Sequence, residues 1–79
     1  MKNDGQLIAD HLITLINERN ITINRLAVLS GINQSTLNAL YDGSSKRPTI
    51  TTIRAICSGL GISVQEFFDF PPYNEVEKN

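Results

Sequence analysis

Cysteine, tryptophan and long apolar runs are what this 79-residue sequence has least of. Its single cysteine, Cys57, excludes an internal disulfide and is typical of a reducing cytosol. With no tryptophan, three phenylalanines and two tyrosines, most of the core must be aliphatic. No stretch approaches the roughly 20 apolar residues of a membrane span, and Asp4 and Asp10 interrupt any signal-peptide core. We therefore expect one small cytoplasmic domain.

Side chains for catalysis or metal binding are also scarce. His11 is the single histidine, and no cysteine or acidic cluster stands at ligand spacing from it, whereas a metal site needs three or four converging ligands. Asp10 adjoins His11, but adjacent helical residues point about 100° apart. Cys57 lies on an apolar stripe and is interpreted as a buried, inert thiol. The sequence predicts no enzyme, metal, cofactor or small-molecule substrate, and it places His11 at the surface or the core boundary.

Apolar residues recur at helical spacing along the chain, and no segment alternates as a strand would. In the first segment Ile8, Leu12 and Ile16 lie four residues apart. The pattern predicts an all-α bundle of five short helices. These helices are expected near residues 6–20, 23–30, 34–42, 50–60 and 64–68, and the fourth is expected to bury Ile50, Ile53, Ile56, Cys57 and Leu60.

Capping residues punctuate the predicted helices. A hydroxyl or amide side chain precedes each of the last four, where it can accept a bond from an orphan backbone N–H. In three cases an isoleucine before the cap and a large apolar residue after it form a hydrophobic staple. Glycines follow three predicted helix ends, where the left-handed conformation needs no Cβ. The caps are Thr22, Asn33, Thr49 and Ser63, with Glu66 completing a capping box, and the glycines are Gly31, Gly43 and Gly61.

The aromatic residues gather at the C-terminal end. We expect a flexible N-terminus over 1–5, a folded domain over 6–68, and a tail over 69–79 that is extended or forms an interface. Phe67 is expected to close the core. Phe68, Phe70 and Tyr73 are candidate interface residues, because exposed aromatic patches often mark interfaces. Capping of the core is the alternative explanation for Phe70 and Tyr73.

Net charge is −1, yet its distribution is uneven. Residues 20–56 hold Arg25, Lys46, Arg47 and Arg54 against Asp42, a net charge of +3. Residues 57–79 hold four acidic residues against one lysine, a net charge of −3. The positive charge therefore lies in the central segment, which permits a nucleic-acid partner there.

Four short motifs stand in order along the chain: T-x-x-x-L-A from Thr22, G-I-N-Q-S-T-L from Gly31, Y-D-G-x-x-K-R-P from Tyr41, and L-G-I-S-V-Q-E-F-F from Leu60. With these motifs, residues 7–68 resemble the phage Cro and lambda-repressor-like family of helix-turn-helix DNA-binding domains. The resemblance implies a lambda-repressor-like bundle whose recognition helix begins after Asn33 and enters the major groove.

Base contacts are implied for the exposed start of that helix. A glutamine at Gln34 suits adenine, because its amide both accepts from N6 and donates to N7. Thr36, Leu37 and Leu40 are expected to face the other helices. The implied base-reading residues are Gln34, Ser35, Asn38 and Ala39. A merely solvated polar helix face is the alternative.

Phosphate contacts are implied for the flanks of the motif. Backbone N–H groups of the 43–48 loop and of the helix start after Thr22 are further candidates. Two positions depart from the family pattern and weaken the expected grip. Ile23 replaces a glutamine that often contacts phosphate and braces the recognition helix, and Asp42 replaces an asparagine. The implied phosphate-contacting residues are Thr22, Asn33, Ser44, Ser45, Lys46 and Arg47.

The leading hypothesis is a bacterial or phage transcriptional regulator that binds double-stranded DNA as a homodimer. One alternative is an antitoxin-like or accessory module with a protein partner at the C-terminal tail. The other is a protein-interaction module that has lost strong DNA binding, which Ile23 and Asp42 would favour.

Overall fold

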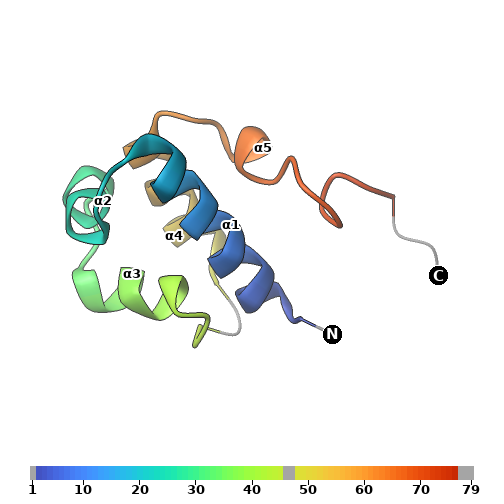
Figure 1. Ribbon diagram of the computed structural model, residues 1–79, viewed down its shortest axis with the longest axis horizontal. Coiled ribbons are helices and arrows are strands. Elements are labelled where there is room, and N and C mark those ends of the chain that lie inside the picture. The colour runs from blue at the N-terminus through green and yellow to red at the C-terminus, as the bar shows by residue number, and fades with distance from the viewer. Residues whose placement is uncertain (1, 46–47, 77–79) are drawn as a thin grey trace.

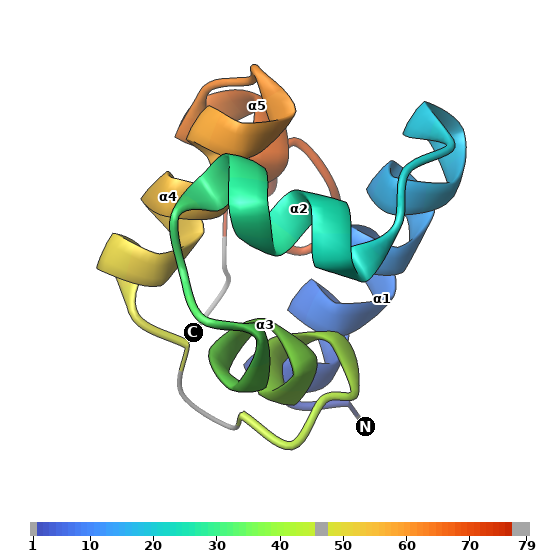
Figure 2. The same ribbon diagram turned by 90° about the vertical axis from the view of Figure 1, so that its left-hand side faces the viewer.

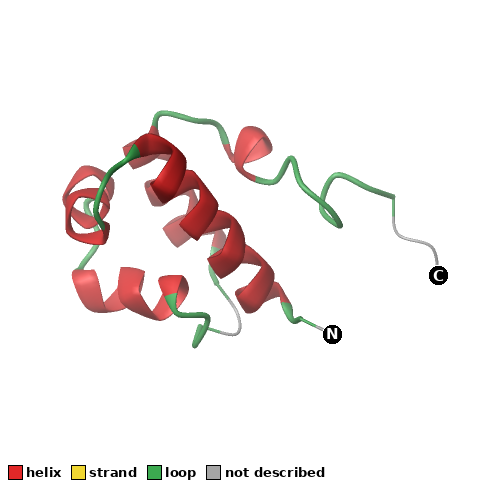
Figure 3. Ribbon diagram, viewed as in Figure 1, coloured by secondary structure: helices red, strands yellow, loops and turns green. Residues whose placement is uncertain are grey.

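The computed structural model describes residues 2–45 and 48–76, and within them the chain forms five helices and no strand (Figures 1 and 3). The helices are α1 (Asp4–Arg19), α2 (Ile23–Ser30), α3 (Gln34–Tyr41), α4 (Ile50–Leu60) and α5 (Val64–Phe67). The expected all-α bundle is confirmed, with three predicted helix ends shifted by one residue. The expected bonds at the four caps form, from Thr22, Asn33, Thr49 and Ser63.

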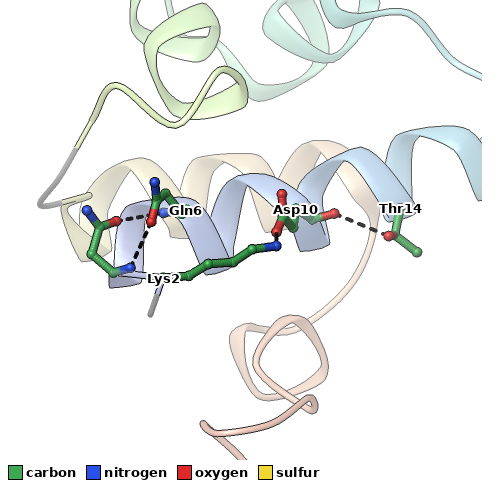
Figure 4. Close-up of polar contacts among 5 residues, drawn as sticks. Lys2, Gln6, Asp10 and Thr14 are labelled. Atoms are coloured by element: carbon green, nitrogen blue, oxygen red, sulfur yellow. Dashed lines mark hydrogen bonds and ion pairs between the residues drawn. The ribbon is translucent and has the colours of Figure 1, made fainter.

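The start of α1 differs from the prediction. The Asn3 side chain accepts the Gln6 N–H at 2.9 Å, and the Gln6 side chain accepts the Asn3 N–H at 3.0 Å. This capping box, together with an ion pair between Lys2 and Asp10, appears in Figure 4. The helix therefore begins at Asp4, and the last two residues of the segment expected to be flexible are helical. An asparagine followed three positions later by a glutamine is a pattern from which this capping box could have been predicted.

The core is aliphatic and draws on the first four helices, closed by Phe67. Helix α2 packs on α4, and α3 packs on α1 and α2. Ile50 is an exception to the predicted burial, because its side chain is 58% exposed. It is the first residue of α4 and extends past the end of the core. The fully buried side chains are Leu12, Leu26, Leu37, Leu40, Ile53, Ile56 and Phe67.

A glycine inside α4 sets how closely α2 approaches. A Cβ on Gly59 would lie 2.4 Å from Ser30 Oγ and 3.0 Å from the Ser30 backbone nitrogen. A side chain at this position would force the Ser30 hydroxyl to move and the Ser30 backbone to shift slightly, so glycine favours this close approach. The contact fixes the end of α2, immediately before the turn at Gly31 where φ is +68°.

The described part of the tail, 69–76, folds back as turns and is not extended. The Tyr73 hydroxyl donates to the Asp4 carboxylate at 2.5 Å, and the Phe70 ring stacks on His11 with centroids 4.0 Å apart. Within the tail, the Asn74 N–H donates to the Phe70 carbonyl at 3.2 Å. The tail is therefore held against α1, because Tyr73 and Phe70 contact side chains of that helix.

Candidate nucleic-acid interface

Helices α2 and α3 form the two arms of a helix-turn-helix, joined by the turn at Gly31 (Figure 2). Only a narrow stripe of α3 is buried, at Leu37 and Leu40, which are 0% and 1% exposed. This stripe anchors α3 on α1 and α2, and the remaining face of the helix is directed outwards. Gln34, Ser35 and Asn38 are exposed and Ala39 is half-buried, so the four predicted base-reading residues share an accessible surface.

Thr36 was expected to face the other helices and instead is exposed. The reason is that α3 lies at the edge of the bundle and packs only on α1 and α2, so no described helix covers the side on which Thr36 lies (Figure 2). Thr36 adds a hydroxyl and a methyl group to the same accessible surface.

Gln34 is tied to α2 by a bond that the sequence did not reveal. Its Nε2 group donates to Oδ1 of Asn24, and both side chains are exposed. The position at which relatives often have the bracing glutamine is Ile23, which packs against the core. Asn24 therefore supplies a brace from the next position along α2.

Asn33 joins the start of α3 to the preceding turn. Its Oδ1 accepts the Thr36 N–H at 2.8 Å and the Ser35 hydroxyl at 2.9 Å. The Nδ2 hydrogens are consequently the donors that Asn33 can offer to an anion. Because the Ser35 hydroxyl donates its proton to Asn33, it can offer only acceptor lone pairs to a base.

The loop after α3 is more self-contained than expected. The Gly43 N–H donates to the Leu40 carbonyl at 3.3 Å, and the Ser45 N–H donates to the Ala39 carbonyl at 3.1 Å. Between them, the Ser44 N–H donates to Asp42 Oδ1 at 2.8 Å. The Ser44 hydroxyl also donates to the Ala39 carbonyl, at 3.3 Å. These three backbone donors, expected to meet phosphate, are already engaged. Lys46 and Arg47, the two cations predicted for this loop, lie outside the described residues.

Asp42 stays ionised beside this surface. Hydrogen bonding from Ser44 stabilises the Asp42 carboxylate and lowers its pKa below the usual value. Its negative charge is thus part of the surface that would approach phosphate, as the sequence indicated.

The start of α2 offers a second set of donors. Thr22 Oγ1 accepts the Arg25 N–H at 3.1 Å, and the first intrahelical bond runs from the Leu26 N–H to the Thr22 carbonyl. The N–H groups of Ile23 and Asn24 precede that bond and carry the positive end of the helix dipole. Arg25 is exposed on the same turn and adds a positive charge beside these donors.

The aromatic side chains line a separate apolar groove of about 540 Å³ between α1, α4 and the tail. Phe68 meets Phe67 and Tyr73 edge to face, each with ring centroids 5.1 Å apart. Burial and the bond to Asp4 raise the pKa of Tyr73 to about 12. The predicted interface residues Phe68, Phe70 and Tyr73 are all half-buried within the chain. The groove is lined by Asp4, Ile8, Pro48, Ile50, Ile53, Phe68 and Tyr73.

His11 lies under the tail at the core boundary. Its ring meets Phe67 edge to face, with centroids 5.3 Å apart, and stacks on Phe70. Burial lowers its pKa, against the opposing effects of the Glu18 charge and the Phe67 backbone. Among the described residues, no three His, Cys, Asp or Glu side chains gather as metal ligands would. None of the described helices has the length and apolar character to cross a membrane.

The chain belongs to the Cro/C1-type HTH DNA-binding domain family, whose model matches residues 11–73. The prophage Lp1 protein 11, known from a crystal structure, is 64% identical, with a TM-score of 0.87 over 96% of this chain and 100% of that one. No curated protein matches. The resemblance and the fold predicted from the sequence are thereby confirmed, and both findings support a DNA-binding regulator of phage type.

Proposed function

We propose that this protein regulates transcription by binding a specific duplex site as a homodimer, with α3 in the major groove. The observation that carries the proposal is the exposed amide and hydroxyl face of α3, held in place by buried Leu37 and Leu40. A rigid helix offering such side chains is what base-edge recognition requires. Occupancy of a promoter-proximal site in the cytoplasm would repress transcription by blocking polymerase.

The base-reading roles follow from the hydrogen-bonding inventory of each side chain. Gln34 offers an acceptor and a donor together, as adenine requires, and Asn38 lies about one turn further along. Ser35 presents lone pairs, which suit an amino group of adenine or cytosine. Ala39 and the exposed Thr36 can each contact a thymine methyl group.

The phosphate contacts come from both flanks of α3. Thr22 stands at the start of α2, whose N-terminal amides and dipole favour an anion. Asn33 donates through Nδ2, and Lys46 and Arg47 supply positive charge from the loop. The hydroxyls of Ser44 and Ser45 are further candidates, and that of Ser44 is the weaker one, since the Ala39 carbonyl already accepts its proton.

The homodimer is supported by the apolar groove, where Ile50 is 58% exposed. Dimeric helix-turn-helix proteins place their recognition helices about 34 Å apart, one turn of the duplex. With principal extents of 40, 23 and 22 Å, two copies lying side by side can span that distance. We propose that the contact involves the groove rim around Phe68 and Tyr73.

The test is selection of bound duplexes from a random library at near-physiological salt. Wild-type protein is compared with Gln34→Ala and with Lys46→Glu/Arg47→Glu. We expect the wild type to enrich an inverted repeat, the glutamine variant to change one base pair per half-site, and the loop variant to lose enrichment. Well-folded wild-type protein that enriches nothing would overturn the proposal.

A second candidate is an accessory or antitoxin-like module that captures a protein through the same groove. The exposed apolar surface at Ile50 and the overall net charge of −1 favour it. Ile50→Arg tests both candidates, since each uses this groove. Under the proposed function the variant should lose dimer formation, and under the second candidate it should lose capture of the partner protein; in both cases each protomer still binds a half-site weakly.

A further inference from the structure

We infer that Asn24 is a positioning residue that presets the Gln34 amide for reading one operator base pair. This inference rests on the proposed function and deepens it. The observation is the bond from Gln34 Nε2 to Asn24 Oδ1, which joins the first residue of α3 to the second residue of α2.

The bond decides which atoms of Gln34 face outwards. An amide nitrogen carries two hydrogens, and Asn24 uses one of them. The other hydrogen and the Oε1 atom remain as an adjacent donor and acceptor, the pair that the N7 and N6 edge of adenine requires. Without Asn24, the amide would rotate freely and present its donor and acceptor in either order.

The bond also reduces the entropic cost of binding. Gln34 is exposed and has three rotatable side-chain bonds, so an unbraced amide must be ordered when DNA arrives. A side chain already held in its bound conformation avoids that cost. Asn24 is suited to this role because its side chain is exposed beside Gln34, whereas Ile23 is turned to the core.

Two substitutions at position 24 distinguish positioning from folding. Asn24→Ala removes the acceptor and keeps a strong helix former. Asn24→Asp keeps an acceptor oxygen and places a negative charge in the first turn, which a helix tolerates well. Gln65→Ala is the matched control, because Gln65 is an exposed amide at the second position of α5, at the opposite end of the molecule from α3 (Figure 2).

The experiment measures affinity for the selected duplex and for one altered at the base pair that Gln34→Ala identifies. We expect the wild type to discriminate roughly tenfold or more. Asn24→Ala should reduce that ratio severalfold, with little change in affinity for an unrelated duplex. Asn24→Asp should bind all duplexes more weakly but keep the ratio, and Gln65→Ala should match the wild type. The double variant Asn24→Ala/Gln34→Ala should discriminate no less than Gln34→Ala alone, because Asn24 acts through Gln34.

A side-chain amide NMR spectrum of the DNA-free protein supplies a readout that folding alone would not change. The Gln34 Nε2 hydrogens should have well-separated shifts in the wild type and coincide with those of solvated glutamines in Asn24→Ala. An unchanged discrimination ratio in Asn24→Ala would overturn the inference. Failure of the wild type to select any duplex would instead overturn the proposed function, and the amide spectrum would still report whether the brace exists.

Discussion

The two ends of this molecule are built by opposite means. At one end, the exposed side chains of α2 and α3 hold one another by amide and hydroxyl bonds, such as Asn24 with Gln34 and Asn33 with Ser35. At the other end, the tail is held against α1 mainly by aromatic packing around His11, together with one hydrogen bond from Tyr73 to Asp4. Polar bonds leave a surface wettable and ready for base edges, whereas aromatic packing removes surface from water. Stability and recognition are thus assigned to different faces of a small domain.

The largest effect is expected where the recognition face meets the core. Leu37→Ala should cost about 2–5 kcal/mol of unfolding free energy, because Leu37 is fully buried and its truncation leaves a cavity in the core. Urea unfolding followed by circular dichroism measures this loss. The exposed neighbour Asn38→Ala serves as a control and should leave the unfolding midpoint nearly unchanged. Comparable losses in both variants would contradict the anchoring role of Leu37.

The next effect separates base reading from phosphate binding. Gln34→Ala should cost about 1–3 kcal/mol at the selected site and relax one base position. Lys46→Ala should weaken all duplexes alike and lower the salt slope by about one. Titrations at several salt concentrations, on the selected and an unrelated duplex, measure both. Equal effects of Gln34→Ala on the two duplexes would place the base-reading surface elsewhere.

A smaller effect is expected at the tail. Tyr73→Phe removes one hydrogen bond to Asp4 and should cost about 1 kcal/mol of stability. Because the bond lies far from α3, affinity for DNA at a concentration where the protein is dimeric should not change. Thermal unfolding and a DNA titration of the same preparation check both parts. A change in sequence preference would show that the two faces are coupled.

The smallest effect concerns pH. Burial holds the pKa of His11 below its ordinary value, so the unfolded chain binds a proton more readily than the folded one. Stability should therefore be complete above about pH 6.5 and decline as pH falls towards the folded-state pKa of His11. Urea midpoints between about pH 7.5 and about pH 5.5, on either side of the ordinary histidine pKa of about 6.5, measure the slope, and His11→Gln should flatten it. A slope of opposite sign in the wild type would show that His11 is charged in the folded state.

The comparison also explains what the sequence could and could not reveal. Helix starts at Thr22, Asn33 and Ser63 were predictable because a cap and its bond lie within three residues. Exposure at Ile50 and Thr36 was not, because it depends on where each helix stands in the bundle. The brace at Asn24 was also hidden, since its partner lies ten residues away on another helix.

The tail shows the same limit. The number of aromatic residues predicted an apolar function for Phe70 and Tyr73, but left core capping and an interface equally open. The contacts of Tyr73 with Asp4 and of Phe70 with His11 could not be predicted, because these partners are distant in sequence and adjacent in space.

The most direct test of the central claim is backbone NMR of the protein titrated with the selected duplex. We expect the largest shift changes on the exposed face of α3, residues 34–39, and at the start of α2. The Tyr73 signal should shift only when the protein dimerises. Raising the protein concentration without DNA should therefore shift it as much as adding the duplex does. Shift changes concentrated around the apolar groove, with α3 unaffected, would contradict the assignment of DNA recognition to α3.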